Sequence, residues 1–194
     1  MSTKYIVNNL SGQTINGNPI LPKYKVYTAL LTQRGGDNFQ NINFGSLIIG
    51  VSYLIDTYQA GDDFSNVGGP GIGTSNQWDG IWFVATGIDP NHWSYSSALI
   101  YNEGAPVVTV LENTIGNIWF TYKVVGAYFV NSNDLFTTDK TAISIDAHGQ
   151  DGVPETIITY ESLNVSNFQF RTIKEGESDN ILYKNILEIR IYNE

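Results

Sequence analysis

The sequence contains no cysteine, which excludes disulfide bonds, thiolate metal sites and cysteine nucleophiles. It also lacks any apolar run near the roughly 20 residues that a membrane helix needs. Residues 1–12 show neither an apolar segment nor a cleavage pattern, which argues against export. We therefore expect a protein that is made in a cytoplasm and is not inserted into a membrane.

Positive charge is scarce, because 10 Lys and Arg stand against 19 Asp and Glu. A net charge of −9 without any basic cluster argues against nucleic-acid binding. The imbalance is also local. Residues 1–35 contain bases and no acid, whereas residues 36–103 contain acids and no base. This change of composition marks a boundary near residue 36.

Glycine and aromatic residues are abundant, with 19 Gly, 12 Tyr, 9 Phe and 4 Trp. This mixture favours short strands joined by tight turns. No segment shows a sustained helical period, so we expect an all-β protein.

The segment Lys23–Gln33 is the strand around which the chain is organised. Both of its faces are apolar or β-branched, which predicts a strand that is covered on both sides, by the insert or by another subunit. One face carries Tyr24, Val26, Thr28 and Leu30, and the other carries Tyr27, Ala29 and Leu31. The next sandwich-type strand begins only near Pro106, which predicts an insertion between the two.

Three regions follow from these patterns. Residues 1–22 are interpreted as an N-terminal arm, with a poorly ordered terminus as the alternative. Residues 23–35 and 104–194 form a β-sandwich, either jelly-roll-like or Ig-like, and residues 36–103 form a small inserted all-β module. Residues 33–36 should then lie close to residues 103–106. The predicted strands are Lys4–Val7, Leu47–Tyr58, Ile81–Thr86, Val107–Leu111, Ile118–Val124, Ala127–Asn131, Ala142–Asp146, Thr156–Tyr160, Asn167–Thr172 and Ile186–Tyr192.

Three motifs carry a resemblance: KVYTALLTQ at 25–33, APVVTVLENTIGNIWFTY at 105–122 and LYKNILEIRIYN at 182–193. Together they resemble a β-domain of structural proteins of tailed bacteriophages, frequent in phages of Bacteroidetes and in gut metagenomes. In the compact form of that domain, the first motif runs through a short turn into the second.

The inserted region resembles a second phage-associated element through GDDFSNVG at 61–68 and FVATGIDPNHW at 83–93. Residues 68–80 depart from it, since GGPGIGTSNQWDG replaces a short turn.

The resemblance implies a non-enzymatic structural component of a phage virion, made in the host bacterial cytoplasm. The position would be capsid-associated, as a decoration or head-fibre protein, or tail-fibre-associated, with the insert projecting from the particle. Expected partners are other virion proteins and further copies of the chain, most simply in a trimer. The basic N-terminal arm would contact an acidic virion surface.

A receptor- or carbohydrate-binding tip that mediates host adsorption is the alternative function. Aromatic residues beside loops suit stacking on a host-surface glycan or packing on a protein. The candidate ligand-binding residues are Trp78, Trp93 and Tyr95, whereas Trp82 lies within a predicted strand and is expected in the core.

No cofactor is expected. Asp62 and Asp63 could form half of a Ca²⁺ site, but they lack the alternating spacing of such loops, and capping of a turn is favoured.

Nothing in the sequence selects a catalytic set, so we expect no enzymatic activity. His92 and His148 both lie beside turns and are interpreted as solvated loop residues. A polysaccharide depolymerase is the weakest hypothesis, and it would draw its carboxylate pair from Asp146, Asp151, Glu155 and Glu161.

Overall fold

A computed structural model of the chain describes residues 14–15, 18–19, 24–146, 157–161, 164–173, 176 and 178–192. In this part of the chain the fold is all-β, as predicted, with one 3-10 turn, η1 (Ser65–Val67). No helix among the described residues has the length and apolarity that a membrane span requires.

Most of the predicted N-terminal arm, including the strand Lys4–Val7, lies outside the described residues. The described part of the arm is a short hairpin, β1 (Thr14–Ile15) paired with β2 (Asn18–Pro19).

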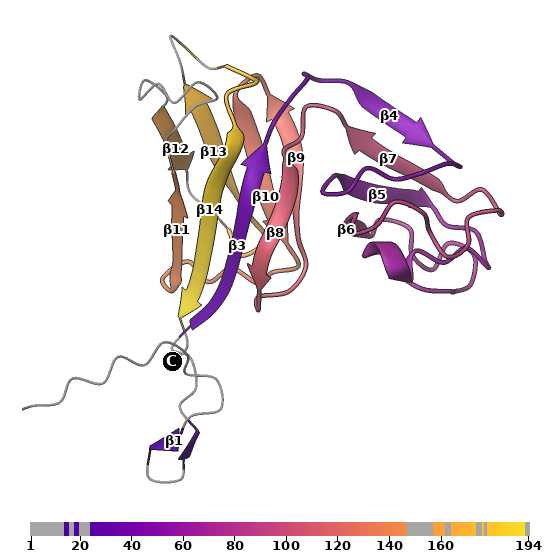
Figure 1. Cartoon of the computed structure of the whole chain (residues 1–194), viewed down its shortest axis with the longest axis horizontal. Helices are drawn as coiled ribbons and strands as arrows, with labels where there is room; N and C mark the ends of the chain where they lie inside the picture. Colours follow the sequence, from indigo (N-terminus) through magenta and orange to yellow (C-terminus); the bar gives the residue numbers. More distant parts are fainter. Residues whose placement is uncertain are drawn as a thin grey trace, which may run out of the picture.

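The larger module is a sandwich of two antiparallel four-stranded sheets (Figure 1). One sheet has the order β11 (Thr141–Ile145), β14 (Tyr183–Tyr192), β3 (Tyr24–Thr32) and β8 (Val107–Asn113). The other has the order β12 (Ile157–Glu161), β13 (Asn167–Ile173), β10 (Ala127–Ser132) and β9 (Ile118–Val124). In each sheet some neighbouring strands follow one another in the sandwich, namely β3 and β8 in one sheet and β9 with β10 and β12 with β13 in the other.

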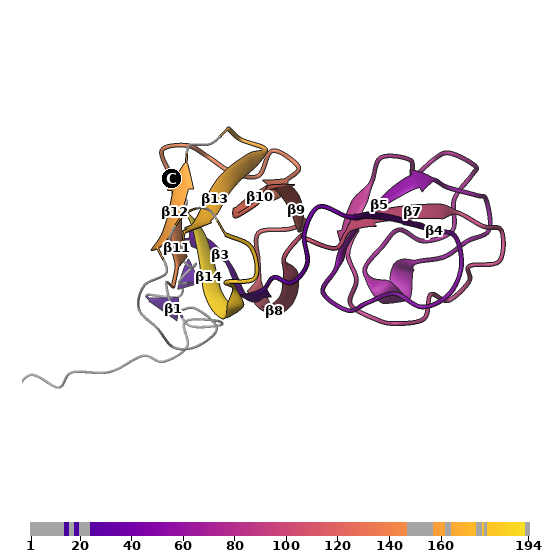
Figure 2. The same cartoon turned by 90° about the horizontal axis from the view of Figure 1, so that it is seen from above.

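Strand β3 lies between β14 and β8, and its two faces differ. Tyr27, Ala29 and Leu31 are buried in the sandwich core, as their alternation predicts. The prediction that the insert covers the opposite face is wrong, whereas cover by another subunit stays a prediction. Apart from Val26, the residues of that face are only half-buried. The insert lies beyond β8 and β9 and does not cover this face (Figures 1 and 2).

Neighbouring side chains of β14 partly shield the outer face of β3. The Arg190 guanidinium lies 4.9 Å from the centre of the Tyr24 ring, and Tyr192 contacts the same ring edge-on. The alternation of β14 is confirmed, since Leu187 and Ile189 are fully buried.

The inserted region forms its own antiparallel sheet. The strand order is β4 (Phe39–Ile42), β7 (Ala98–Asn102), β5 (Ser52–Thr57) and β6 (Trp82–Val84). β4 and β7 had not been predicted. A separate core fills this module, with Tyr53, Ile55, Tyr58, Phe64, Phe83 and Leu99 at its centre.

The predicted strand Leu47–Tyr58 begins later than expected, at Ser52. Gly50 interrupts it with φ +84°, and Leu47 instead donates from its N–H to the Ile88 carbonyl. A Cβ on Gly50 would lie 2.3 Å from the Val108 carbonyl oxygen, so only glycine permits this approach of the insert to β8.

The two ends of the insert meet, which confirms that residues 33–36 lie close to residues 103–106. A Cβ built on Gly35 would be 3.2 Å from the Glu103 carbonyl oxygen, and one on Gly104 would be 2.6 Å from that of Gly36. Glu103 also donates from its N–H to the Asn38 carbonyl.

The register also fixes which end of the sandwich carries the insert. Tyr24 pairs with Tyr192, so the first sandwich strand starts where the last one ends. Thr32 pairs with Val107 at the opposite end, where the chain leaves for the insert and returns. Figure 1 shows the insert joined to the sandwich at this second end.

Candidate functional site

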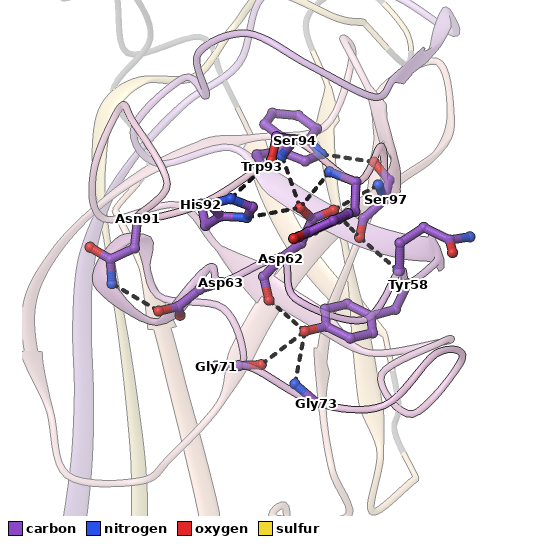
Figure 3. A network of polar contacts seen from close by, with 12 residues as sticks. Tyr58, Asp62, Asp63, Gly71, Gly73, Asn91, His92, Trp93, Ser94 and Ser97 are labelled. Carbon is purple, nitrogen blue, oxygen red and sulfur yellow. Dashed lines mark hydrogen bonds and ion pairs between the residues drawn. The ribbon is translucent and has the colours of Figure 1, made fainter.

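The GDDFSN turn and the loop before β7 converge on Asp62, whose side chain is fully buried (Figure 3). Its Oδ1 accepts hydrogen bonds from the N–H groups of Ser94 (2.9 Å) and Tyr95 (3.0 Å). Its Oδ2 accepts from the N–H (2.9 Å) and the hydroxyl (2.7 Å) of Ser97. One carboxylate therefore holds two loops together that lie more than 30 residues apart in the chain.

The charge of Asp62 is retained despite burial. Burial by itself raises the pKa of this carboxyl, but the Ser97 hydroxyl and the three N–H donors together outweigh that effect and lower the pKa below its ordinary value. Asp62 is therefore an ionised anchor at neutral pH.

Tyr58 extends the network to the long loop before β6 (Figure 3). Its hydroxyl donates to the Asp62 carbonyl (2.5 Å) and accepts from the Gly73 N–H (2.9 Å). The Tyr58 backbone N–H donates to Asp79 (2.7 Å). The ring itself is buried in the insert core, so these bonds fix the loop to the core.

Asp63 caps the turn that leads into η1. Its Oδ1 accepts from the Ser65 N–H (2.9 Å) and hydroxyl (2.6 Å), and its Oδ2 accepts from the Asn91 amide (3.1 Å). The hydrogen bonds from Ser65 lower the pKa of this carboxyl. Turn capping, favoured from the sequence, is the arrangement found.

The geometry does not favour Ca²⁺ at Asp62 or Asp63. N–H and O–H hydrogens point at the oxygens of both carboxylates, where a cation would have to bind. Within the described ranges, no group of three or more His, Cys, Asp or Glu side chains could hold a metal ion.

Asp62, His92 and Ser94 have the residue types of a hydrolytic triad but not its geometry. His92 Nε2 lies 2.9 Å from the Ser94 hydroxyl oxygen, whereas Nδ1 lies 3.6 Å from Asp62 Oδ1, beyond hydrogen-bond distance. The neighbouring N–H groups, which could stabilise an oxyanion, already donate to Asp62. The arrangement stabilises the loop and is not poised for acyl transfer.

The remaining candidates for catalysis are mostly outside the described residues. His148, Asp151 and Glu155 lie there, and the side chain of Glu161 is not described. Asp146 accepts a hydrogen bond from the Ile186 N–H (2.8 Å).

The three aromatic candidates do not form one exposed platform. Trp78 and Trp93 are half-buried against the insert core, and their ring N–H groups donate to the carbonyls of Gly71 (3.0 Å) and Ser97 (2.8 Å). Tyr95 is 58% exposed and contacts the His92 ring, with 5.0 Å between the ring centres. Tyr95 is thus the one of the three whose ring is largely exposed.

Trp82 occupies a different place from the one expected. It is half-buried and stacks on Trp119 of β9, with 6.4 Å between ring centres and 9° between planes, rather than packing inside the insert core. It therefore belongs to the contact between the two modules.

A pocket of about 210 Å³ opens beside this contact. Strands β4, β5, β6, β7 and β9 and one loop residue contribute to it. The lining residues are Phe39, Ser52, Trp82, Asn102, Ala105, Phe120, Thr121 and Tyr122. Sequence reasoning missed this site because its walls come from segments that no local motif connects.

Comparison of the chain with protein-family models, with curated proteins and with solved structures finds no match in any of the three.

Proposed function

We propose that this protein is a non-enzymatic structural component of a bacteriophage virion, associated with the capsid as a decoration or head-fibre protein or with the tail fibre. The observation that carries the proposal is the polarity of the sandwich. β3 starts and β14 ends at one end, while the insert joins at the other. The first end is suited to attachment to the particle, and the second to presenting the insert.

The contact between the modules supports presentation in a fixed orientation. Val108 donates from its N–H to the Gly50 carbonyl (2.9 Å), Phe120 donates to the Ser52 hydroxyl (2.9 Å), and the Asn117 amide donates to the Trp82 carbonyl (2.9 Å). With the tryptophan stack, these bonds make the insert a rigid extension of the sandwich rather than a module on a flexible tether.

Self-association, most simply as a trimer, is proposed for the half-covered outer face of β3 and β14. Leu30 pairs there with Ile186, which is 45% exposed, and Tyr192 is 41% exposed further along β14. Covering such residues with another copy would remove apolar surface from water. Light scattering at micromolar concentration should give the mass of an oligomer, and a monomer would count against this assignment.

Deletion of the insert tests the virion role. The closeness of Gly35 and Gly104 allows a short Asn-Gly linker to replace residues 36–103. Particles assembled with this variant should contain it in amounts like the wild type, measured by immunoblot of purified particles. Deletion of residues 1–22 should abolish incorporation while leaving the sandwich folded. Loss of incorporation in the first variant, or its retention in the second, would contradict the assigned roles.

A second candidate function is recognition of a host-surface glycan or receptor by the insert. The exposed ring of Tyr95, next to His92, is the observation that favours it. Tyr95→Ala should lower adsorption to host cells without changing particle assembly, and Phe44→Ala, at another exposed aromatic residue of the insert, is the matched control. Unchanged adsorption of Tyr95→Ala would remove Tyr95 from the binding surface.

A further inference from the structure

The pocket between the two modules has the composition of a small-molecule site. Such sites are concave, lie preferentially between domains, and combine apolar walls with a few polar groups. Here the walls are aromatic on both sides, with Phe39 and Trp82 from the insert and Tyr122 from β9, whereas the Phe120 ring is buried in the sandwich core. Phe39 is 66% exposed at the rim, so the pocket is open to solvent on that side.

Two hydroxyl-bearing residues, Ser52 and Thr121, belong to the pocket lining. Ser52 accepts a hydrogen bond from the Phe120 N–H (2.9 Å), and Thr121 accepts one from the Asn131 amide (3.1 Å). Ser52 is buried, whereas Thr121 is half-buried. The Thr121 hydroxyl hydrogen has no acceptor among the described residues, so this hydroxyl is the one able to donate to a ligand. The Asn102 side chain is engaged with Asp37 and Gly104 and serves as a fixed wall.

The charges around the pocket restrict the ligand class. Asp37 holds the Asn102 amide, and Asp179 accepts from the Tyr122 hydroxyl, so the charged groups hydrogen-bonded to the lining are acids. Lys123, on the same face of β9 as Thr121, is engaged with Gln169 and the Phe129 ring. The insert contains no Lys or Arg at all. Phosphorylated, sulfated or uronic ligands would be repelled, whereas a neutral ligand would not.

The volume of the pocket restricts the size of the ligand. A cavity of about 150 Å³ accommodates benzene, so 210 Å³ accommodates one six-membered ring with polar substituents. A pyranose has this size, and it combines an apolar face of C–H groups with a rim of hydroxyls. The apolar face fits the aromatic walls, and the rim of hydroxyls fits the Thr121 hydroxyl.

We propose that the pocket between the modules binds a neutral pyranose unit of a glycan. This inference rests on the second function above, glycan recognition, and adds the junction as a glycan subsite that is separate from the surface at Tyr95. An apolar side chain of a protein partner is the competing occupant, and the experiment separates the two.

Ligand-observed saturation-transfer NMR on the purified full chain provides the test. The probes are the methyl glycosides of glucose, galactose, mannose and N-acetylglucosamine, with methyl glucuronoside as the charged comparison and toluene as the apolar one. Phe39→Ala and Thr121→Val alter the pocket. Phe44→Ala, at another exposed phenylalanine of the insert that is absent from the lining, is the matched control.

We expect at least one neutral glycoside to bind and methyl glucuronoside not to bind. Phe39→Ala should weaken binding about threefold to tenfold through loss of one aromatic contact. Thr121→Val should weaken it too, whereas Phe44→Ala and Tyr95→Ala should bind as the wild type does. Unchanged melting temperatures for Phe39→Ala will show that the loss is not unfolding.

Three results would overturn the inference in distinguishable ways. Binding lost in Tyr95→Ala and kept in the pocket variants would move the site while retaining glycan recognition. Saturation by toluene without any glycoside signal would assign the pocket to an apolar partner. No glycoside binding at millimolar concentration, together with wild-type adsorption of particles that carry Tyr95→Ala, would remove both the inference and the glycan function.

Discussion

Asp62→Asn should destabilise the insert by about 2–4 kcal/mol. Asparagine keeps the shape of the side chain but presents an NH₂ group where one carboxylate oxygen now accepts. In either orientation the NH₂ group faces N–H donors, those of Ser94 and Tyr95 or that of Ser97. At least one hydrogen bond to a charged acceptor is lost, worth about 1.5–3 kcal/mol, and a buried donor is left unsatisfied.

Equilibrium unfolding in urea, followed by tryptophan fluorescence, measures this change. Three of the four tryptophans, at 78, 82 and 93, lie in the insert, so the signal reports chiefly on that module. Asp63→Asn is the matched control, because Asp63 is partly exposed and its bonds lie at the surface. Asp63→Asn should lower the free energy of unfolding far less than Asp62→Asn does. A loss below about 1 kcal/mol for Asp62→Asn, or an equal loss for Asp63→Asn, would refute the role of Asp62 as the anchor of the two loops.

Three further predictions follow from other contacts. The pKa of Asp62 lies below its ordinary 3.8 in the folded protein, so the contribution of this carboxylate to stability is complete above pH 3.8 and is lost as the pH falls through the folded-state pKa. The difference in free energy of unfolding between the wild type and Asp62→Asn should therefore be constant from pH 5 to 7 and shrink towards pH 2. Gly50→Ala should weaken the contact between the modules, and faster hydrogen exchange at the Val108 amide, which donates to Gly50, would show it. Burial, followed by the hydrogen bond to Asp179, raises the pKa of Tyr122 to about 12. Asp179→Asn should therefore lower the pKa of Tyr122 in a spectrophotometric titration, while burial should keep it above the ordinary value of 10.

The sandwich strands were predictable because burial imposes a clear alternation on them. Ile118–Val124 was predicted with both ends correct, and in β14 the row with Leu187 and Ile189 was assigned to the core. By contrast, β4 was missed because Phe39–Ile42 is a short edge strand with no buried residue. Local alternation carries no signal where neither face is buried.

The candidate site was predictable only in its local part. Asp63 and Ser65 are close in sequence, and a capped turn could be inferred from their spacing. The Asp62 anchor was not predictable, because its donors at Ser94–Ser97 lie beyond an intervening strand and depend on how the two loops fold over the sheet. Trp93, expected to bind a ligand, supports this same loop through Ser97, so Trp93→Ala would confuse loss of binding with loss of structure.

The junction between the modules gives the insertion a physical role. The pocket takes one wall from the insert, at Phe39 and Trp82, and one from β9, at Tyr122, so it exists only while the two modules keep their present orientation. The close approach at Gly50 and the Trp82–Trp119 stack hold that orientation. A sandwich in which β3 ran through a short turn directly into β8 would keep the attachment end and lose the pocket. On the functions proposed here, the insert therefore adds ligand recognition to a structural domain. Removal of the insert should abolish glycan binding while leaving incorporation into particles unchanged.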